Sequence, residues 1–138
     1  MCIRDSLTCG PGQFDQVERL TQYLSKEVPY TFISTELSVL LGITANAKFV
    51  VCHNGGYMHA VSAIGVPLTA LFGLTDYRIW RPSGETSVVL HKDIDCWPCN
   101  SKTMKQVCWN GKPECKELIS AQDVIDSIKK LCPEFSDK

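Results

Sequence analysis

Residues 49–76, FVVCHNGGYMHAVSAIGVPLTALFGLTD, contain the pattern that decides the fold. The apolar run at 49–52, within a strand predicted over 48–52, has the length and β-branched composition of a buried strand. A turn with two glycines, Gly55 and Gly56, follows, and we expect backbone conformations there that are closed to other residues. A helix is predicted over 57–64, ended by Gly65, and a second apolar strand over 68–72. The apolar face of this predicted helix should consist of Tyr57, Ala60, Val61 and Ile64.

The turn after the first strand is a candidate ligand site. In an open parallel sheet such turns lie at the carboxyl edge, where ligands bind. His59 should point away from the apolar helix face, in a first turn whose N–H groups favour an anion. The second strand leads into another loop, 73–76, so two adjacent parallel strands would bring both loops to one cleft. The alternatives are a surface histidine after an ordinary turn and a loop that caps its own backbone.

Outside this stretch, strands and helices continue to alternate. Strands are predicted at 7–9, 30–33 and 87–90, and helices at 13–25, 37–44 and 121–131, the last with a capping box of Ser120 and Asp123. Residues 77–85 are predicted to be a polar loop and 96–115 a long ordered loop. The fold class is therefore α/β, an open, mostly parallel Rossmann-like sheet with helices on both faces. The chain begins as if inside a βα unit, so we expect a fragment of something larger.

Composition narrows the choice of partner and compartment. The 138 residues are 44% hydrophobic and 21% charged with a net charge of −1, typical of a globular domain. Such a charge gives no reason to expect nucleic acid as a partner. No apolar run approaches the roughly 18 residues of a membrane span. Without a signal-peptide pattern, we expect a cytoplasmic protein.

Four of the eight cysteines cluster near the carboxyl end. Their spacing is Cys-x2-Cys-x8-Cys-x6-Cys, and the first pair resembles the knuckle of structural zinc sites. Reactive or uncombined thiols and disulfides are the alternatives, disulfides being the weaker one in a cytoplasmic chain. We expect one zinc ion, bound by Cys96, Cys99, Cys108 and Cys115.

The residues from about Leu7 to Leu131 resemble family 9 glycosyltransferases, the lipopolysaccharide heptosyltransferases. The resemblance is carried by the run HNGGYMHAVSAIGVPLTALFGLTDYRIWRP and by the cysteine segment before the last helix. The matching residues are Gly56, Met58, His59, Gly65, Val66, Pro67, Phe72, Gly73, Thr75, Asp76, Trp80, Arg81 and Pro82. Asn54, Gly55 and Tyr57 depart from the usual Asp, Thr and Pro.

The resemblance implies the carboxyl half of a GT-B fold, the domain that binds the nucleotide-sugar donor. It implies inverting transfer of a heptose or related sugar from an ADP-heptose-like donor to a lipopolysaccharide-type acceptor, with no cofactor required. The catalytic base and acceptor surface are expected in an amino-terminal domain. The donor-binding residues would be Asn54, Gly55, Gly56, Met58, His59, Gly73, Thr75 and Asp76.

These inferences combine into one hypothesis. Residues 7–132 form the nucleotide-sugar-binding domain, 1–6 an unstructured or non-native start, and 133–138 a tail. The chain is expected in the cytoplasm, with the inner membrane face as a peripheral location. The competing hypotheses are a non-catalytic nucleotide-binding or zinc-stapled module and a fragment of another GT-B enzyme, such as a sugar epimerase.

Overall fold

The computed structural model describes residues 5–10, 12–24, 29–99, 108 and 111–135. It divides into two compact units, Met1–Ile43 and Thr44–Lys138, which are considered separately. None of the described helices is long and apolar enough to cross a membrane.

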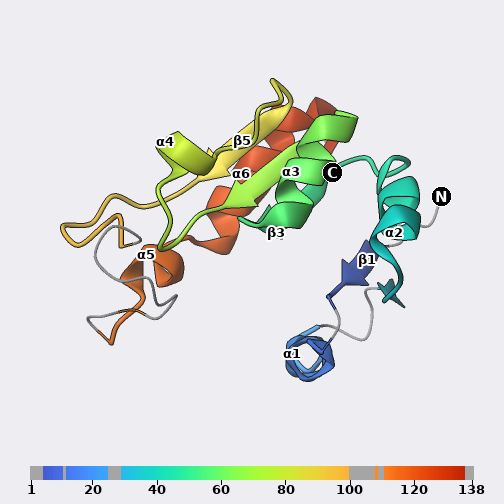
Figure 1. Ribbon diagram of the computed structural model, residues 1–138, viewed down its shortest axis with the longest axis horizontal. Helices are drawn as coiled ribbons and strands as arrows, with labels where there is room; N and C mark the ends of the chain where they lie inside the picture. Colours follow the sequence, from blue (N-terminus) through green and yellow to red (C-terminus); the bar gives the residue numbers. More distant parts are fainter. Residues whose placement is uncertain (1–4, 11, 25–28, 100–107, 109–110, 136–138) are drawn as a thin grey trace. The chain divides into compact units, whose positions relative to one another are not determined.

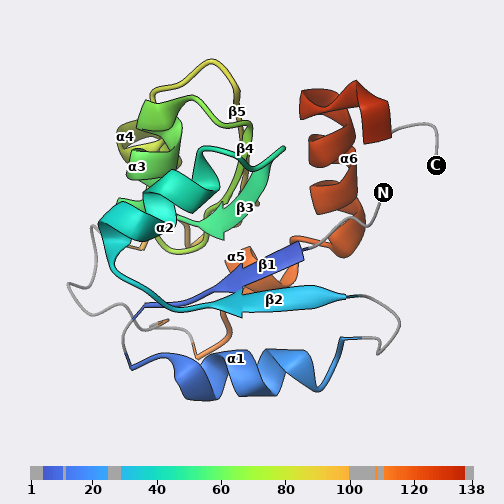
Figure 2. The same ribbon diagram turned by 90° about the vertical axis from the view of Figure 1, so that its right-hand side faces the viewer.

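The first unit contains a parallel pair of strands with a helix between them in sequence. Strand β1 (Asp5–Thr8) pairs with β2 (Tyr30–Ile33) from Asp5↔Tyr30 to Thr8↔Ile33. Helix α1 (Phe14–Thr21) packs along this pair through an edge-to-face contact of Phe14 and Phe32, whose centroids are 5.8 Å apart (Figure 2). Strand β1 thus includes Asp5 and Ser6, where the sequence indicated no element. Helix α2 (Leu37–Thr44) follows β2.

The second unit is built on a three-stranded parallel sheet in the order β3-β4-β5. The strands are β3 (Val50–His53), β4 (Leu68–Leu71) and β5 (Ser87–Leu90). Helix α3 (Gly56–Ile64) covers one face, and α6 (Ala121–Leu131) covers the other (Figures 1 and 2). The predicted parallel α/β architecture with helices on both faces is confirmed in this unit.

The core of the second unit surrounds the central strand β4. Because both of its faces are covered, Leu68, Thr69 and Ala70 are completely buried. Leu68 and Ala70 belong to a cluster with Met58, Val61, Val66 and Phe72. Thr69, the alternate residue, shares a hydrogen bond with the Ser127 hydroxyl of α6 over 2.9 Å, and Ser127 donates to Val124 O over 2.7 Å.

Helix α3 is present as predicted, but its predicted apolar face is only partly correct: Val61 is buried and Tyr57 packs against the core, whereas Ile64 does not. The buried side chains are Met58, Val61 and Ser62, whereas Ile64 is 41% exposed. Packing on the sheet rotates the helix so that a polar residue faces inward, where the Ser62 hydroxyl accepts a hydrogen bond from Gly84 N over 2.9 Å. Gly65 ends the helix in the left-handed conformation, with φ of 79°, as predicted.

The segment after β4 is more regular than predicted. Residues 77–85 were expected to be a polar loop, but Tyr77–Trp80 forms the single helical turn α4. Asp76 is its N-cap and accepts a hydrogen bond from Arg78 N. The sequence pattern missed this turn because four residues are too few to show helical periodicity.

The cysteine segment, predicted to be a loop as far as residue 115, ends in helix α5 (Glu114–Glu117), which contains Cys115. The part of that segment at 100–107 and 109–110 lies outside the described residues. The capping box of α6 is confirmed: Ser120 Oγ accepts from Asp123 N over 3.1 Å, and Ser120 N donates to Asp123 Oδ2 over 2.7 Å. A short 3-10 helix, Pro133–Phe135, packs Phe135 against Phe49.

Candidate functional site

The two loops after β3 and β4 are joined to each other, as the sequence predicted. Their strands are adjacent and parallel, so both loops leave the same edge of the sheet. Asn54 Nδ2, just after β3, donates a hydrogen bond to Thr75 Oγ1 in the loop after β4 over 2.6 Å. At the backbone, Asn54 N donates to Leu71 O over 3.0 Å. These contacts fix the spacing of the two loops.

A cavity of about 340 Å³ opens between these loops and the start of α3. That volume lies within the range that holds small-molecule ligands. The predicted residues Gly73 and Asp76 do not line it, whereas Trp80 does so without having been predicted as a site residue. The lining residues are Asn54, Gly55, Gly56, Met58, His59, Thr75 and Trp80.

The two glycines serve the cavity in a different way from the one predicted. Gly55 has φ of 166° and ψ of −179°, an extended conformation that any residue adopts. Gly56 is not among the glycines with positive φ, so the prediction of special backbone conformations is wrong. A Cβ on Gly56 would meet no atom within 4 Å. Because Gly55 and Gly56 have no side chains, a ligand in the cavity can approach their backbone amide groups closely.

The amino end of α3 supplies donors to the cavity. The first turn closes when His59 N donates to Gly55 O over 3.4 Å, and the N–H groups before it have no intrahelical acceptor. The His59 side chain is exposed and lines the cavity. Met58, the preceding residue, is completely buried in the core and contributes apolar surface. The site thus combines anion-favouring donors with one titratable side chain.

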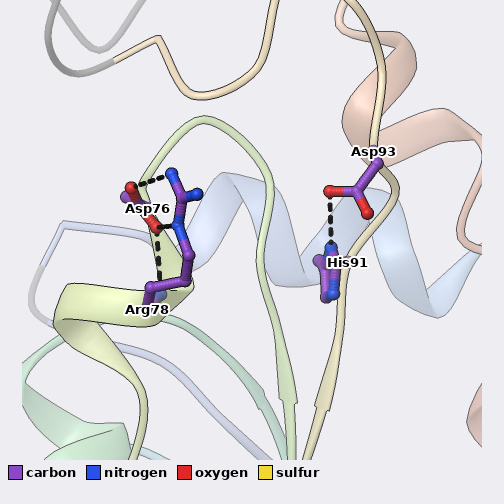
Figure 3. Close-up of polar contacts among 4 residues, drawn as sticks. All are labelled: Asp76, Arg78, His91 and Asp93. Atoms are coloured by element: carbon purple, nitrogen blue, oxygen red, sulfur yellow. Dashed lines mark hydrogen bonds and ion pairs between the residues drawn. The ribbon is translucent and has the colours of Figure 1, made fainter.

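Asp76 makes a compact ion pair beside the cavity (Figure 3). Its Oδ2 lies 2.6 Å from a terminal nitrogen of Arg78, and its Oδ1 accepts from Arg78 Nε over 2.9 Å. The hydrogen bond from the Arg78 side chain holds the pKa of Asp76 below its usual range. A carboxylate with these partners is already occupied, so the loop does cap its own backbone at Asp76. The placement of Asp76 in the donor site stays a prediction.

Trp80 is the lining residue that the prediction of site residues omitted. It ends α4 and is 51% exposed, so a large flat apolar surface borders the cavity. The signal was present in the sequence, because Trp80 begins the Trp-Arg-Pro motif of the family resemblance. Its place beside the cavity could not be predicted, because residues 77–85 were expected to be a polar loop and the turn α4 is what brings Trp80 to the cavity.

The cysteine segment shows thiols near one another without a formed ligand shell. Within the described residues, no three His, Cys, Asp or Glu side chains are grouped so as to hold a metal ion. Cys99 and Cys115 are buried. Burial raises the pKa of the Cys115 thiol, and charge on Cys99, Cys108 and Cys96 acts in the same direction. Zinc at these four cysteines stays a prediction, which metal analysis of protein purified without chelators can test.

Cys52, the third residue of β3, is part of the core packing of the second unit. It packs against the core cluster, and burial raises the pKa of its thiol to about 11. A thiol with such a pKa is protonated and unreactive at neutral pH. Cys52 is therefore a packing residue and takes no part in the candidate site.

Comparison with known proteins gives a consistent family match. Residues 6–110 match the family model described as glycosyltransferase family 9 (heptosyltransferase). Lipopolysaccharide heptosyltransferase 3 of Escherichia coli is 29% identical over 135 residues, which are 93% of this chain and 37% of that protein. Lipooligosaccharide heptosyltransferase 2 of Campylobacter jejuni is 26% identical over 133 residues, 92% of this chain and 40% of that protein.

Two solved structures share the fold. The structure of E. coli ADP-heptose lipopolysaccharide heptosyltransferase II matches with a TM-score of 0.75 at 18% identity, over 95% of this chain and 37% of that one. The family 9 glycosyl transferase of Veillonella parvula matches with a TM-score of 0.72 at 19% identity, over 94% and 36%. The chain therefore spans less than half the length of the relatives it matches.

Proposed function

The chain belongs to glycosyltransferase family 9, the heptosyltransferases, and from that membership we propose that it binds the nucleotide-sugar donor of an inverting glycosyltransferase. The donor would be an ADP-heptose-like nucleotide diphosphate sugar, and the acceptor a lipopolysaccharide core or similar glycan. The observation that carries the proposal is the cavity at the amino end of α3, lined by Gly55, Gly56 and His59.

The chemistry of that cavity suits a diphosphate. Backbone N–H groups at a helix start, together with the positive end of the helix dipole, favour an anion. The bare backbone at Gly55 and Gly56 allows phosphate oxygens to approach, and the exposed His59 ring can donate a further hydrogen bond. Trp80 offers a flat surface for a base or sugar ring.

These groups would also assist transfer. In inverting transfer the nucleotide diphosphate leaves as an anion while the sugar carbon becomes cation-like. Donors fixed in advance around the leaving phosphate stabilise the charge that develops in the transition state. His59 and the α3 amides are the groups that would do so, and on this proposal transfer needs no cofactor.

The rest of the active site is proposed to lie outside these residues. The E. coli and Campylobacter relatives are matched over only 37% and 40% of their length. We place the acceptor surface and the catalytic base in an amino-terminal domain of the complete enzyme. The enzyme would work in the cytoplasm, with peripheral contact to the inner membrane face where its acceptor is made.

Calorimetry with ADP and other nucleoside diphosphates tests the donor site. His59→Ala should weaken ADP binding by about 1–3 kcal/mol, the usual loss for a hydrogen bond to a charged group. His53→Ala is the matched control, because His53 is exposed at the end of β3 but does not line the cavity. Equal affinities of wild type and His59→Ala would remove His59 from the site. Absence of binding to every nucleotide would overturn the proposal.

A further inference from the structure

Trp97, Cys99 and Lys116 of α5 contact the loop after β4 and the start of α4 at three places. Cys99 N donates a hydrogen bond to Leu74 O over 2.9 Å. The Lys116 side chain lies across Gly73, since a Cβ on Gly73 would meet Lys116 Cγ at 2.6 Å. Trp97 lies beside Tyr77, with ring centroids 5.5 Å apart and planes inclined by 22°. The cavity residue Thr75 lies in the middle of the residues held in this way.

Trp97 belongs to a stack of three rings. Tyr77 stacks on His91 at 4.0 Å, and His91 lies 5.7 Å from Trp97. His91 follows β5, and its Nδ1 is 3.4 Å from Asp93 Oδ1, within ion-pair distance but outside hydrogen-bond geometry (Figure 3). The three rings therefore form one cluster, in which Tyr77 contacts both His91, just after β5, and Trp97. Offset ring pairs of this kind stabilise beyond the area that they bury.

Arg78 connects this stack to the ion pair beside the cavity. Its guanidinium carbon lies 5.2 Å from the Trp97 ring centroid, within the range of a cation–π contact. The same guanidinium binds the carboxylate of Asp76. Asp76 in turn caps α4, the turn that ends at Trp80. A continuous series of contacts therefore leads from Trp97 through Arg78 to Asp76. Thr75 precedes Asp76 in the chain, and Trp80 N donates a hydrogen bond to Asp76 O over 3.1 Å.

We propose that Trp97 is a positioning residue for the donor site, and that Trp97 and Cys99 hold the loop and turn at 73–80 in their binding conformation. The inference rests on the proposed function for the identity of the ligand. Trp97 does not line the cavity and would act on the ligand only through other residues. The ring keeps Tyr77 and Arg78 in place, and these keep Thr75 and Trp80 against the cavity.

The test compares Trp97→Leu with Trp97→Phe. Leucine removes both the stacking and the cation–π contact, whereas phenylalanine retains an aromatic face for each. We expect Trp97→Leu to weaken ADP binding about three- to tenfold and Trp97→Phe to stay within about twofold of wild type. Phe135→Leu is the control, because it removes the ring contact with Phe49 at 5.4 Å without touching the loop. Equal losses in Trp97→Leu and Phe135→Leu would overturn the proposal.

A second measurement needs no ligand. Amide hydrogen exchange should accelerate at 76–81 in Trp97→Leu and remain at the wild-type rate in Phe135→Leu. Arg78→Leu, which removes the guanidinium that joins Trp97 to Asp76, should show the same local acceleration. Unchanged exchange in both Trp97→Leu and Arg78→Leu would contradict the positioning role. If wild type bound no nucleotide but the local acceleration appeared, the proposed function would fail and the positioning role would stand.

Discussion

Asn54 and Thr75 show how one hydrogen bond shapes the candidate site. Both are loop residues, 21 positions apart, and their 2.6 Å contact joins the ends of two strands. The Asn54 amide is the donor, so the Thr75 hydroxyl hydrogen remains available to a ligand. The family pattern usually has an aspartate at the position of Asn54. A carboxylate at that position would accept the hydrogen of the Thr75 hydroxyl, which would then not be available to a ligand.

A double-mutant cycle can measure this bond. We expect the Asn54→Ala and Thr75→Val substitutions to show a coupling of about 0.5–1.5 kcal/mol in urea unfolding, because each removes one partner of the same bond. Thr86→Val is a suitable control, since its hydroxyl makes only a 3.4 Å contact with Gly65 O. Strictly additive effects of the two substitutions would show that the bond contributes nothing to stability.

For single residues, the sequence predicted which ones lie at the cavity better than what each one does there. His59 and Asn54 were predicted at the site and line its cavity, because a turn after a parallel strand must lie at the sheet edge. The role of Gly55 was mistaken, because a glycine pair does not distinguish a positive φ from a need for space. Asp76 was assigned to the ligand, but its partner Arg78 was not recognisable from spacing alone.

Among the elements, strands were predicted more accurately than helix orientation. Strands β2 and β5 have the predicted bounds, because short apolar runs between turn residues leave little choice. The face of α3 was predicted one position away from the buried one. Its sequence is apolar on several sides, so the phase was set by packing and by the Gly84–Ser62 hydrogen bond, which the sequence does not reveal.

The capping box of α6 makes stability depend on pH. Hydrogen bonds from the Ser120 backbone and side chain, and then from Lys92, lower the pKa of Asp123 from 3.8 to about 2. A carboxylate with a lowered pKa in the folded state stabilises above its unfolded pKa, and this contribution is lost as pH falls from about 4 to about 2. We expect Asp123→Asn to reduce the pH dependence of the melting temperature in that window.

Asp126→Asn provides the comparison for that measurement, since Asp126 lies on the same helix outside the capping box and, within the described residues, accepts a side-chain hydrogen bond from Gln122 over 2.8 Å. It should leave the slope nearly unchanged. An Asp123→Asn protein whose melting temperature falls as steeply in acid as that of wild type would show that the capping box does not titrate as expected.

At the scale of the whole molecule, we expect this chain to bind the donor weakly and to transfer no sugar. Half of a substrate cleft gives little water exclusion and does not position the acceptor, and these effects account for many powers of ten in rate. The measurement is transfer of labelled sugar to a truncated lipopolysaccharide acceptor. A full-length family member such as the E. coli enzyme serves as the positive control. Repeated turnover by the 138-residue chain would refute the expectation.

The family was accessible from sequence because its motifs are contiguous. Trp80, Arg81 and Pro82 follow Thr75 and Asp76 after only three intervening residues, so one run of residues contained the resemblance. The division of the chain into two units at residues 43 and 44 was not accessible, because it depends on which elements pack together. Local patterns do not encode such long-range preferences.

The hydroxyl pair of Thr69 and Ser127 has a consequence for how the sheet and its covering helix find each other. Hydrocarbon surfaces are interchangeable, so a purely apolar helix can slide along a sheet at small cost. A slide of one turn in one direction would place Leu131 opposite Thr69 and leave a fully buried hydroxyl without a partner, at a cost of about 1–3 kcal/mol. A slide in the other direction would place the Asp123 carboxylate there and break the capping box that it makes with Ser120. The hydroxyl groups of Thr69 and Ser127 thereby select one docking position for α6 among several that would have similar energies if the contacts were apolar alone.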